Sequence, residues 1–188
     1  KFISLSTEVL PEIREYERTS TTVINSYVGP IVHDYLNSLS TRLQNDGIAG
    51  SLDIMKSDGG VMSVDVAVRT PAQMIESGPA AGVMASARLA KLTGHPNLIT
   101  FDMGGTTAKA SVLESGLPTW TTEYEVGEGI TLSSKLTKGR GHALRLPVID
   151  LAEVGTGGGS IVRVDEGGGI KVGPESSGAS PGPACYNI

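Results

Sequence analysis

The longest regular pattern of apolar positions runs from Thr19 to Gln44 and has the period of an α-helix. Apolar side chains recur there at intervals of three and four residues, at Val23, Ile24, Tyr27, Val28, Ile31, Tyr35, Leu39 and Leu43. Thr21 or Thr22 can cap the start, and Gly47 can end the helix. A proline inside a helix removes a backbone donor, so the Gly29-Pro30 pair predicts a kink or two abutting helices.

A turn signal then predicts a small β-hairpin. Asp58-Gly59-Gly60 is a hairpin-type turn signal that is flanked by Ser51–Ser57 and Val61–Met62. Ser63 can cap a short helix after the hairpin, and Ala72–Ile75 is expected to form a strand.

A second long helix is rich in alanine, which allows it to pack closely against a sheet. It is predicted to start at a Ser77 cap, to hold Pro79 in its first turn and to reach about Leu92. The remaining apolar runs are short and are separated by turn residues or by a polar loop at Gly127–Gly141. They predict strands at Asn97–Phe101, Ala108–Leu113, Thr119–Glu125, Leu146–Leu151, Ser160–Asp165 and Ile170–Gly173.

These elements predict an α/β fold with β-hairpins and packed helices. Residues 1–95 form a helix-rich part with one small hairpin, and residues 96–188 form a β-rich part with glycine-rich loops. Lys1 is not an initiator methionine, and Ile188 follows a loop rich in proline and glycine, so both ends are expected to be truncated.

Composition narrows the function classes. A hydrophobic content of 39% with 19% charged residues is typical of a globular protein, and the net charge of −5 argues against non-specific nucleic-acid binding. The basic stretch Lys135, Lys138, Arg140 and Arg145 is expected to be a solvated loop. No long apolar run or signal peptide appears, and a single cysteine cannot form an internal disulfide, which together predict a cytoplasmic protein that does not bind membranes.

The segment from Asp102 to Thr107 is the strongest candidate for chemistry. An apolar strand delivers Asp102, and Gly104 and Gly105 allow backbone amides to converge on an anion, with the hydroxyls of Thr106 and Thr107 as further donors. The carboxylate could hold Mg²⁺, usually through water. An ordinary Gly-Gly hairpin turn capped by the aspartate explains the same residues, and the turn alone favours that simpler interpretation.

A second glycine cluster, Gly155–Gly159, follows an apolar run and precedes a strand. Its glycines let the backbone approach a nucleotide or another segment closely, or they form a flexible connection or a bulge. The cluster is not a P-loop, because no Gly-Lys-Ser/Thr follows. It also lacks the helix that follows a dinucleotide-binding fingerprint.

Metal and thiol chemistry have little support. The three histidines, His33, His95 and His142, share no metal-ligand spacing with one another or with Cys185. His142, Asp150 and Glu153 could meet as a second divalent-metal site, although nothing in the sequence requires it. Cys185 lies in a loop rich in proline and glycine, where a buried inert thiol is expected.

Several blocks of the sequence, in order, resemble the hydantoinase A/5-oxoprolinase family, which includes N-methylhydantoinases and acetone carboxylase-like proteins. The segment from Phe101 to Thr107 is similar to the family's internal phosphate motif. Further similar blocks are Pro11–Thr22, Ser57–Met62, Glu76–Gly82, Gly155–Ile161 and Pro181–Tyr186.

The resemblance implies an actin-like ATPase fold of the ribonuclease H type, with a mixed sheet, and a fragment of its central domain. It implies a hydrolase of cyclic amides, of the hydantoin or 5-oxoproline type, that uses ATP to phosphorylate the substrate carbonyl, often with a B-type partner subunit. In that scheme Asp102 positions Mg²⁺ or the attacking group. Gly104, Gly105, Thr106 and Thr107 hold phosphate, and Gly157, Gly158 and Gly159 lie near the nucleotide. An ATP-dependent ketone carboxylase and a small-molecule kinase of the same fold remain alternatives, as does a module whose glycine loops only shape an assembly surface.

Two departures from the family pattern affect these expectations. Many members have an Asp where this chain has Lys109, so a cation stands beside the phosphate hairpin. The family's amino-terminal lobe, with its first phosphate motif, is not in this sequence. We therefore expect this chain by itself to bind ATP weakly at best and to have no turnover.

Overall fold

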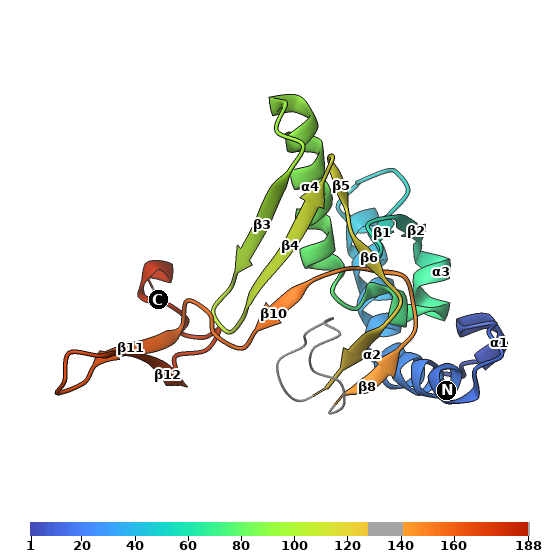
Figure 1. The fold of residues 1–188 in the computed structure, drawn as a ribbon. Coiled ribbons are helices and arrows are strands. Elements are labelled where there is room, and N and C mark those ends of the chain that lie inside the picture. Colours follow the sequence, from blue (N-terminus) through green and yellow to red (C-terminus); the bar gives the residue numbers. More distant parts are fainter. Residues whose placement is uncertain (128–140, 188) are drawn as a thin grey trace.

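The computed structural model has an α/β architecture and describes residues 1–127 and 141–187 (Figure 1). The helices are α1 (Ser6–Val9), α2 (Glu15–Asn45), α3 (Val64–Arg69) and α4 (Ser77–Thr93), with the 3-10 turns η1 (Pro71–Met74) and η2 (Ala184–Tyr186). The strands are β1 (Asp53–Met55), β2 (Val61–Ser63), β3 (Leu98–Met103), β4 (Ala108–Glu114), β5 (Leu117–Pro118), β6 (Trp120–Thr121), β7 (Tyr124–Val126), β8 (His142–Leu144), β9 (Val148–Ile149), β10 (Ala152–Val154), β11 (Ser160–Val164) and β12 (Ile170–Ser176). Among the described helices, none is long and apolar enough to cross a membrane.

The largest sheet has the strand order β10-β4-β3, with β5 also paired to β4. Helix α4 lies along one face of the β3–β4 hairpin (Figure 1). Its Ala80 and Val83 share a buried core with Leu113 of β4 and with Ile149 and Leu151. Small residues on α4 allow this close approach, as its alanine-rich sequence predicts.

Helix α2 is a single helix of 31 residues that runs through Pro30, so the alternative of two abutting helices is wrong. It begins at Glu15, four residues before the predicted start. Thr21 and Thr22 therefore lie inside the helix instead of capping it, and the Thr22 hydroxyl donates to the carbonyl of Arg18. The helix ends next to Gly47, whose φ of 74° favours glycine.

Two further cores join α2 to the rest of the chain. Ile24 of α2 packs with Tyr124 of β7 and Leu144 of β8, and Leu36 packs with a separate core that contains Ile54 and Met62 of the β1–β2 hairpin. Two of the three cores thus combine residues from before and after position 95. The division into parts at residue 95 stays a prediction.

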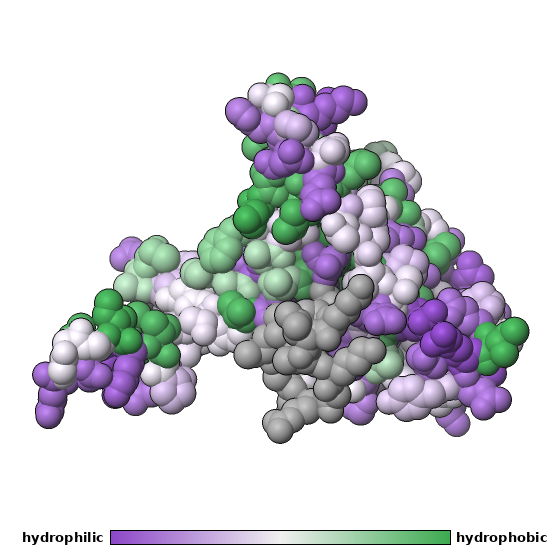
Figure 2. Space-filling view, viewed as in Figure 1, coloured by the Kyte–Doolittle hydropathy of each residue, from purple (hydrophilic) through white to green (hydrophobic). Residues whose placement is uncertain are grey.

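Part of the apolar pattern of α2 is exposed. Val23, Tyr27, Ile31 and Tyr35 lie on its outer side, with Tyr27 81% exposed. Apolar side chains also gather over the β3–β4 region and on the β11–β12 hairpin (Figure 2). Among the described residues, α2 therefore buries some of its apolar side chains, such as Ile24 and Leu36, and leaves others exposed.

The predicted hairpins are confirmed, and one predicted strand is wrong. β1 pairs with β2 and β11 pairs with β12, both antiparallel. Ala72–Ile75 forms no strand, because Pro71–Met74 is the 3-10 turn η1. The α/β class is confirmed, while every strand pairing between described residues is antiparallel, so this part of the sheet is not itself mixed.

Candidate phosphate-binding site

Asp102 lies inside strand β3, not at the start of the turn as predicted. The strand continues through Met103, and Asp102 pairs in register with Lys109 of β4. The strand continues because β3 and β4 stay in register for two pairs beyond Phe101, namely Asp102 with Lys109 and Met103 with Ala108. The turn itself consists of Gly104–Thr107 and is closed by a hydrogen bond from the Gly104 amide to the Thr107 carbonyl, at 3.0 Å.

The Gly155–Gly159 segment packs directly on this turn. The amides of Gly158 and Gly159 donate to the carbonyls of Gly104 and Gly105, at 2.9 and 2.8 Å. A Cβ at Gly157 would lie 2.7 Å from the Thr107 nitrogen, which no side chain tolerates. The structure therefore brings together all seven residues predicted to bind the cofactor, and it does so by contact between backbones.

A third segment, which the sequence reasoning missed, completes this packing. The Ser177 amide donates to the Gly159 carbonyl at 2.8 Å, and the Ser177 hydroxyl donates to the Gly182 carbonyl at 2.8 Å. A Cβ at Gly105 would lie 2.5 Å from the Gly178 carbonyl oxygen. The glycines at 178 and 182 were the only signal in the sequence for this contact. We call the three packed segments Gly104–Thr107, Gly157–Gly159 and Ser177–Gly178 the glycine cluster.

The glycine cluster determines which amides remain available to an anion. The amides of Gly104, Gly158 and Gly159 are already used in hydrogen bonds within the protein. Within the described part of the chain, the amides of Gly105, Thr106 and Thr107 donate to no backbone or side-chain acceptor. The amides that could bind an anion are therefore those of Gly105, Thr106 and Thr107, while the Gly157–Gly159 loop holds the turn in place through its own hydrogen bonds.

A charged cluster lies next to the turn. The Lys109 ammonium contacts a carboxylate oxygen of Glu76 and lies 3.5 Å from Oε1 of Glu153. All three side chains are largely buried. Glu76 is the N-cap of α4 and has a φ of 64°, a left-handed conformation that a non-glycine residue rarely adopts. Ser77, predicted as the cap, is the first helical residue instead.

The charged cluster also affects Tyr124, which is 4% exposed. Burial raises the pKa of the Tyr124 hydroxyl, and the nearby carboxylates of Glu76 and Glu153 raise it further. Burial likewise raises the pKa of Asp150. Burial is the first cause of both shifts, so these two groups lie where water solvates them poorly.

The possible second metal site does not form. Glu153 contacts Lys109, and no group of three or more His, Cys, Asp or Glu side chains among the described residues could hold a metal ion. His142 instead lines an apolar groove beside α2. Cys185 is exposed, so the expectation of a buried thiol is wrong. Its surroundings lack the apolar packing that burial needs, because η2 contributes no buried residue.

Part of the predicted basic loop can be described. Arg145 lies against Glu12, with its Nε 2.6 Å from a carboxylate oxygen, and its amide donates to the Thr21 hydroxyl. The neighbouring residues Lys135, Lys138 and Arg140, and residues 128–140 of the predicted loop, lie outside the described residues.

Comparison with known proteins gives the class of the fold. The chain superposes on the solved structure of the ATP-dependent caprolactamase from Pseudomonas jessenii with a TM-score of 0.69 and 33% identity, over 97% of this chain and 24% of that one. It superposes on nucleotide-free acetone carboxylase with a TM-score of 0.68 and 26% identity, over 93% of this chain and 22% of that one. The fold is that of an actin-like ATPase.

Sequence comparison gives the family. The model of the hydantoinase/oxoprolinase family matches residues 18–188, and the chain belongs to that family of ATP-dependent hydantoinases, oxoprolinases and carboxylases. An uncharacterised protein of Methanocaldococcus jannaschii is 51% identical over 96% of this chain and 26% of its own length. The alpha subunit of the P. jessenii caprolactamase is 35% identical over 98% of this chain and 25% of its own length. The chain thus spans about a quarter of the length of these relatives.

Proposed function

We propose that this chain forms part of the ATP site of an enzyme that hydrolyses cyclic amides of the hydantoin or 5-oxoproline type. The observation that carries the proposal is the Gly104–Thr107 turn, which two other backbone segments hold in place and in which three amides have no acceptor among the described residues. The likeness to a caprolactamase named as ATP-dependent supports the nucleotide and the amide class together.

The turn is suited to phosphate because its donors are backbone amides in a preorganised arrangement. Amides held in place by the glycine cluster need no reorganisation when an anion arrives, which is the property that makes such donors effective in catalysis. Thr106 and Thr107 add hydroxyl donors at the same place. We assign the β- and γ-phosphate oxygens of ATP to this turn.

ATP supplies the phosphoryl group that activates the amide. The substrate carbonyl oxygen forms a bond to the γ-phosphorus, the bond from that phosphorus to the bridging oxygen breaks, and ADP leaves. The amide nitrogen loses its proton as a carbon–nitrogen double bond forms. Water then adds to the activated carbon, its two protons pass to the nitrogen, and the carbon–nitrogen bond breaks, which leaves an amine and an acyl phosphate. A second water hydrolyses the acyl phosphate to a carboxylate and inorganic phosphate. Asp102 positions Mg²⁺ or the attacking group in this scheme, and the turn positions phosphate.

The residues present fit a magnesium ion. The Asp102 side chain is exposed, and it takes part in no ion pair or hydrogen bond within residues 1–127 and 141–187. A carboxylate in this state is the hard oxygen donor that Mg²⁺ prefers, with water completing the coordination. When bound, Mg²⁺ supplies neutralisation of the phosphate charge.

We also propose that the enzyme works with a B-type partner subunit in the cytoplasm. The caprolactamase relative is itself named as an alpha subunit, which supports a partner. The net charge of −5 is unfavourable for binding a nucleic acid.

The test is ADP release by the full-length protein with its presumed partner subunit. Cyclic amides and ketones are supplied with and without bicarbonate, and the organic product is identified. The proposal predicts ring-opened product in step with ADP, and strong loss of both in Gly157→Ala but not in Gly155→Ala. ADP release that needs a ketone and bicarbonate would indicate a carboxylase instead, and a phosphorylated product with an intact ring would indicate a kinase. Turnover of cyclic amides without nucleotide consumption would refute the proposal.

A further inference from the structure

A cavity of about 360 Å³ lies between α4 and the β3–β4 hairpin, and one of its lining residues, Asp102, precedes the Gly104–Thr107 turn by two positions. We call it the α4 cavity. Its apolar lining includes Pro79, Val83 and Leu151, and its polar lining includes Thr100, Asp102 and Lys109. Its volume and its combination of apolar walls with a few polar groups are typical of sites that bind small molecules.

Two of the four polar side chains that line the α4 cavity, Ser86 and Thr100, are already hydrogen-bonded within the protein. The Ser86 hydroxyl donates to the Gly82 carbonyl in its own helix, at 2.9 Å. The Thr100 hydroxyl donates to the Ser111 carbonyl and accepts from the Ser111 amide. These two residues therefore offer a ligand little.

Lys109 and Asp102 differ from them. An ammonium group has three N–H donors, and Lys109 has two partners, the carboxylates of Glu76 and Glu153. Because these carboxylates hold the ammonium, it forms no ion pair with Asp102. One donor of Lys109 thus remains for a ligand, and so does one carboxylate oxygen of Asp102 when the other holds Mg²⁺.

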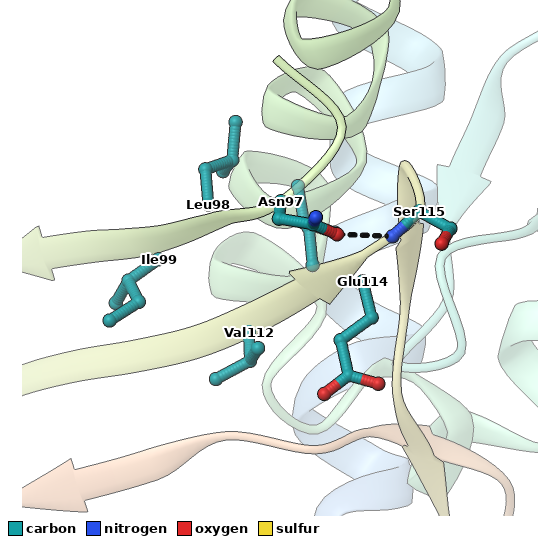
Figure 3. Close-up of a pocket in the computed structure, with 7 residues that line it drawn as sticks. Asn97, Leu98, Ile99, Val112, Glu114 and Ser115 are labelled. Carbon is teal, nitrogen blue, oxygen red and sulfur yellow. Dashed lines mark hydrogen bonds between the residues drawn. The ribbon is translucent and has the colours of Figure 1, made fainter.

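The two residues lie side by side on one face of the hairpin. Asp102 and Lys109 are partners in the strand register, so their side chains leave the same face. Leu98 lies on the α4 side of the hairpin, whereas Ile99 and Val112 lie on the opposite side (Figure 3). Because side chains alternate along a strand, Asp102, four residues after Leu98, also lies on the α4 side.

We propose that the α4 cavity binds the substrate and recognises the amide in its cis form. The Lys109 ammonium donates to the carbonyl oxygen while the Asp102 carboxylate accepts from the amide N–H. The inference rests on the proposed function and deepens it by naming the substrate site. In small rings the amide is held cis, so its C=O and N–H lie on the same side and meet a donor and an acceptor that stand side by side. An open-chain secondary amide adopts this form in only roughly one to two molecules in a hundred.

Lys109 thus has a specific task in this arrangement, because it is the donor that stands beside the Asp102 acceptor. A second carboxylate beside Asp102 offers two acceptors and no donor, so it cannot bind both ends of a neutral amide. Glu76 and Glu153 are the positioning residues in this arrangement, because they hold the ammonium away from Asp102.

The first test uses the unaltered full-length protein without nucleotide, with binding followed by ligand-observed NMR and competition. The probes are 2-pyrrolidone, N-methyl-2-pyrrolidone, which lacks the N–H, and N-methylacetamide, which is open-chain and trans. We expect 2-pyrrolidone to bind roughly tenfold more tightly than either of the other two, because each loses a charge-assisted hydrogen bond. Equal binding of the three probes, or binding of none, would overturn the inference.

The second test places the site in the cavity. Lys109→Met should weaken 2-pyrrolidone binding roughly tenfold. It should reduce, but not abolish, the preference of the protein for 2-pyrrolidone over N-methyl-2-pyrrolidone. Asp102→Ala should abolish that preference fully, since the N–H partner is gone. Ser86→Ala is the matched control, because its hydroxyl is satisfied within α4, and it should leave binding within about twofold. Unchanged probe selectivity in Asp102→Ala would place the lactam elsewhere.

The two proposals fail in different ways. If the ATP proposal fails, the protein consumes no nucleotide but still distinguishes the three probes. If the inference fails and the ATP proposal holds, cyclic amides drive ADP release although the probes bind equally. Gly157→Ala separates them further, because it should abolish ATP-dependent turnover while 2-pyrrolidone still binds.

Discussion

Replacing Gly157 by alanine tests the glycine cluster directly. An added Cβ would lie 2.7 Å from the Thr106 carbonyl carbon and the Thr107 nitrogen, and 2.8 Å from the Gly104 carbonyl oxygen. All three atoms belong to the backbone of the turn, so no side chain can rotate away to relieve the contact. Overpacking of this kind costs about 1–3 kcal/mol of stability, which lowers Tm by roughly 2–12 °C in a chain of this length.

The control is Gly155→Ala, at a glycine of the same loop whose added Cβ would meet no atom within 4 Å. Neither glycine has the positive φ that disfavours a side chain, so the two variants differ only in this contact. Thermal and urea unfolding of both variants, beside the unaltered protein, measure the difference. If the two unfold at the same temperature and urea concentration, the three segments do not pack as described, and the support for the phosphate turn is lost.

Three further predictions concern other parts of the chain. Asn25 is fully buried and makes three hydrogen bonds, to Ser4, Arg69 and Ala72. Asn25→Ala should therefore lower the free energy of unfolding by about 2–4 kcal/mol, whereas Asn37→Ala, at an exposed position, should change it by less than about 0.5 kcal/mol. A similar loss in both variants would contradict this prediction. The pKa of Tyr124 is higher in the folded protein than in the unfolded chain, so the unfolded chain loses this proton first and the free energy of unfolding should fall as pH rises above about 10. The fall should be smaller in Tyr124→Phe. Urea unfolding of both proteins at pH 8 and pH 11 measures it, and an equal loss of stability in the two would refute the prediction. The 188-residue chain alone should show only weak ATP binding by isothermal titration, and a micromolar dissociation constant would contradict that expectation.

Helix α2 shows how far a pattern of apolar residues can be interpreted. Its period correctly predicted helical structure from Thr19 to Gln44, because residues three and four apart share a face in any helix, although the abutting helices considered at Pro30 proved to be one helix. The period did not predict which apolar side chains are buried. Ile24 and Leu36 pack into cores, whereas Val23 and Tyr27 face outward. That division depends on where η1, β8 and the β1–β2 hairpin contact the helix, and those contacts join residues far apart in the sequence.

A local proline and a long-range hydrogen bond together explain the one strand that was predicted wrongly. Ala72–Ile75 is apolar enough for a strand, but Pro71 begins a 3-10 turn, and the Ala72 amide donates to the buried Asn25 side chain 47 residues earlier. A short apolar segment has no period of its own by which to distinguish the two. The long-range hydrogen bond decided its conformation.

The sequence by itself determined the local elements and the two glycine segments that carry the candidate site. Glycine clusters and strand periods depend only on neighbouring residues, and they can be recognised without knowledge of the fold. Only the tertiary structure decided what those segments do to one another: that Gly157–Gly159 uses its amides to hold the turn, that Ser177 and Gly178 complete the packing, and that Glu76 and Glu153 draw Lys109 away from Asp102. Each of these contacts joins positions at least 18 residues apart, and their distances are set by the packing of α4 and the sheet, which no local pattern encodes.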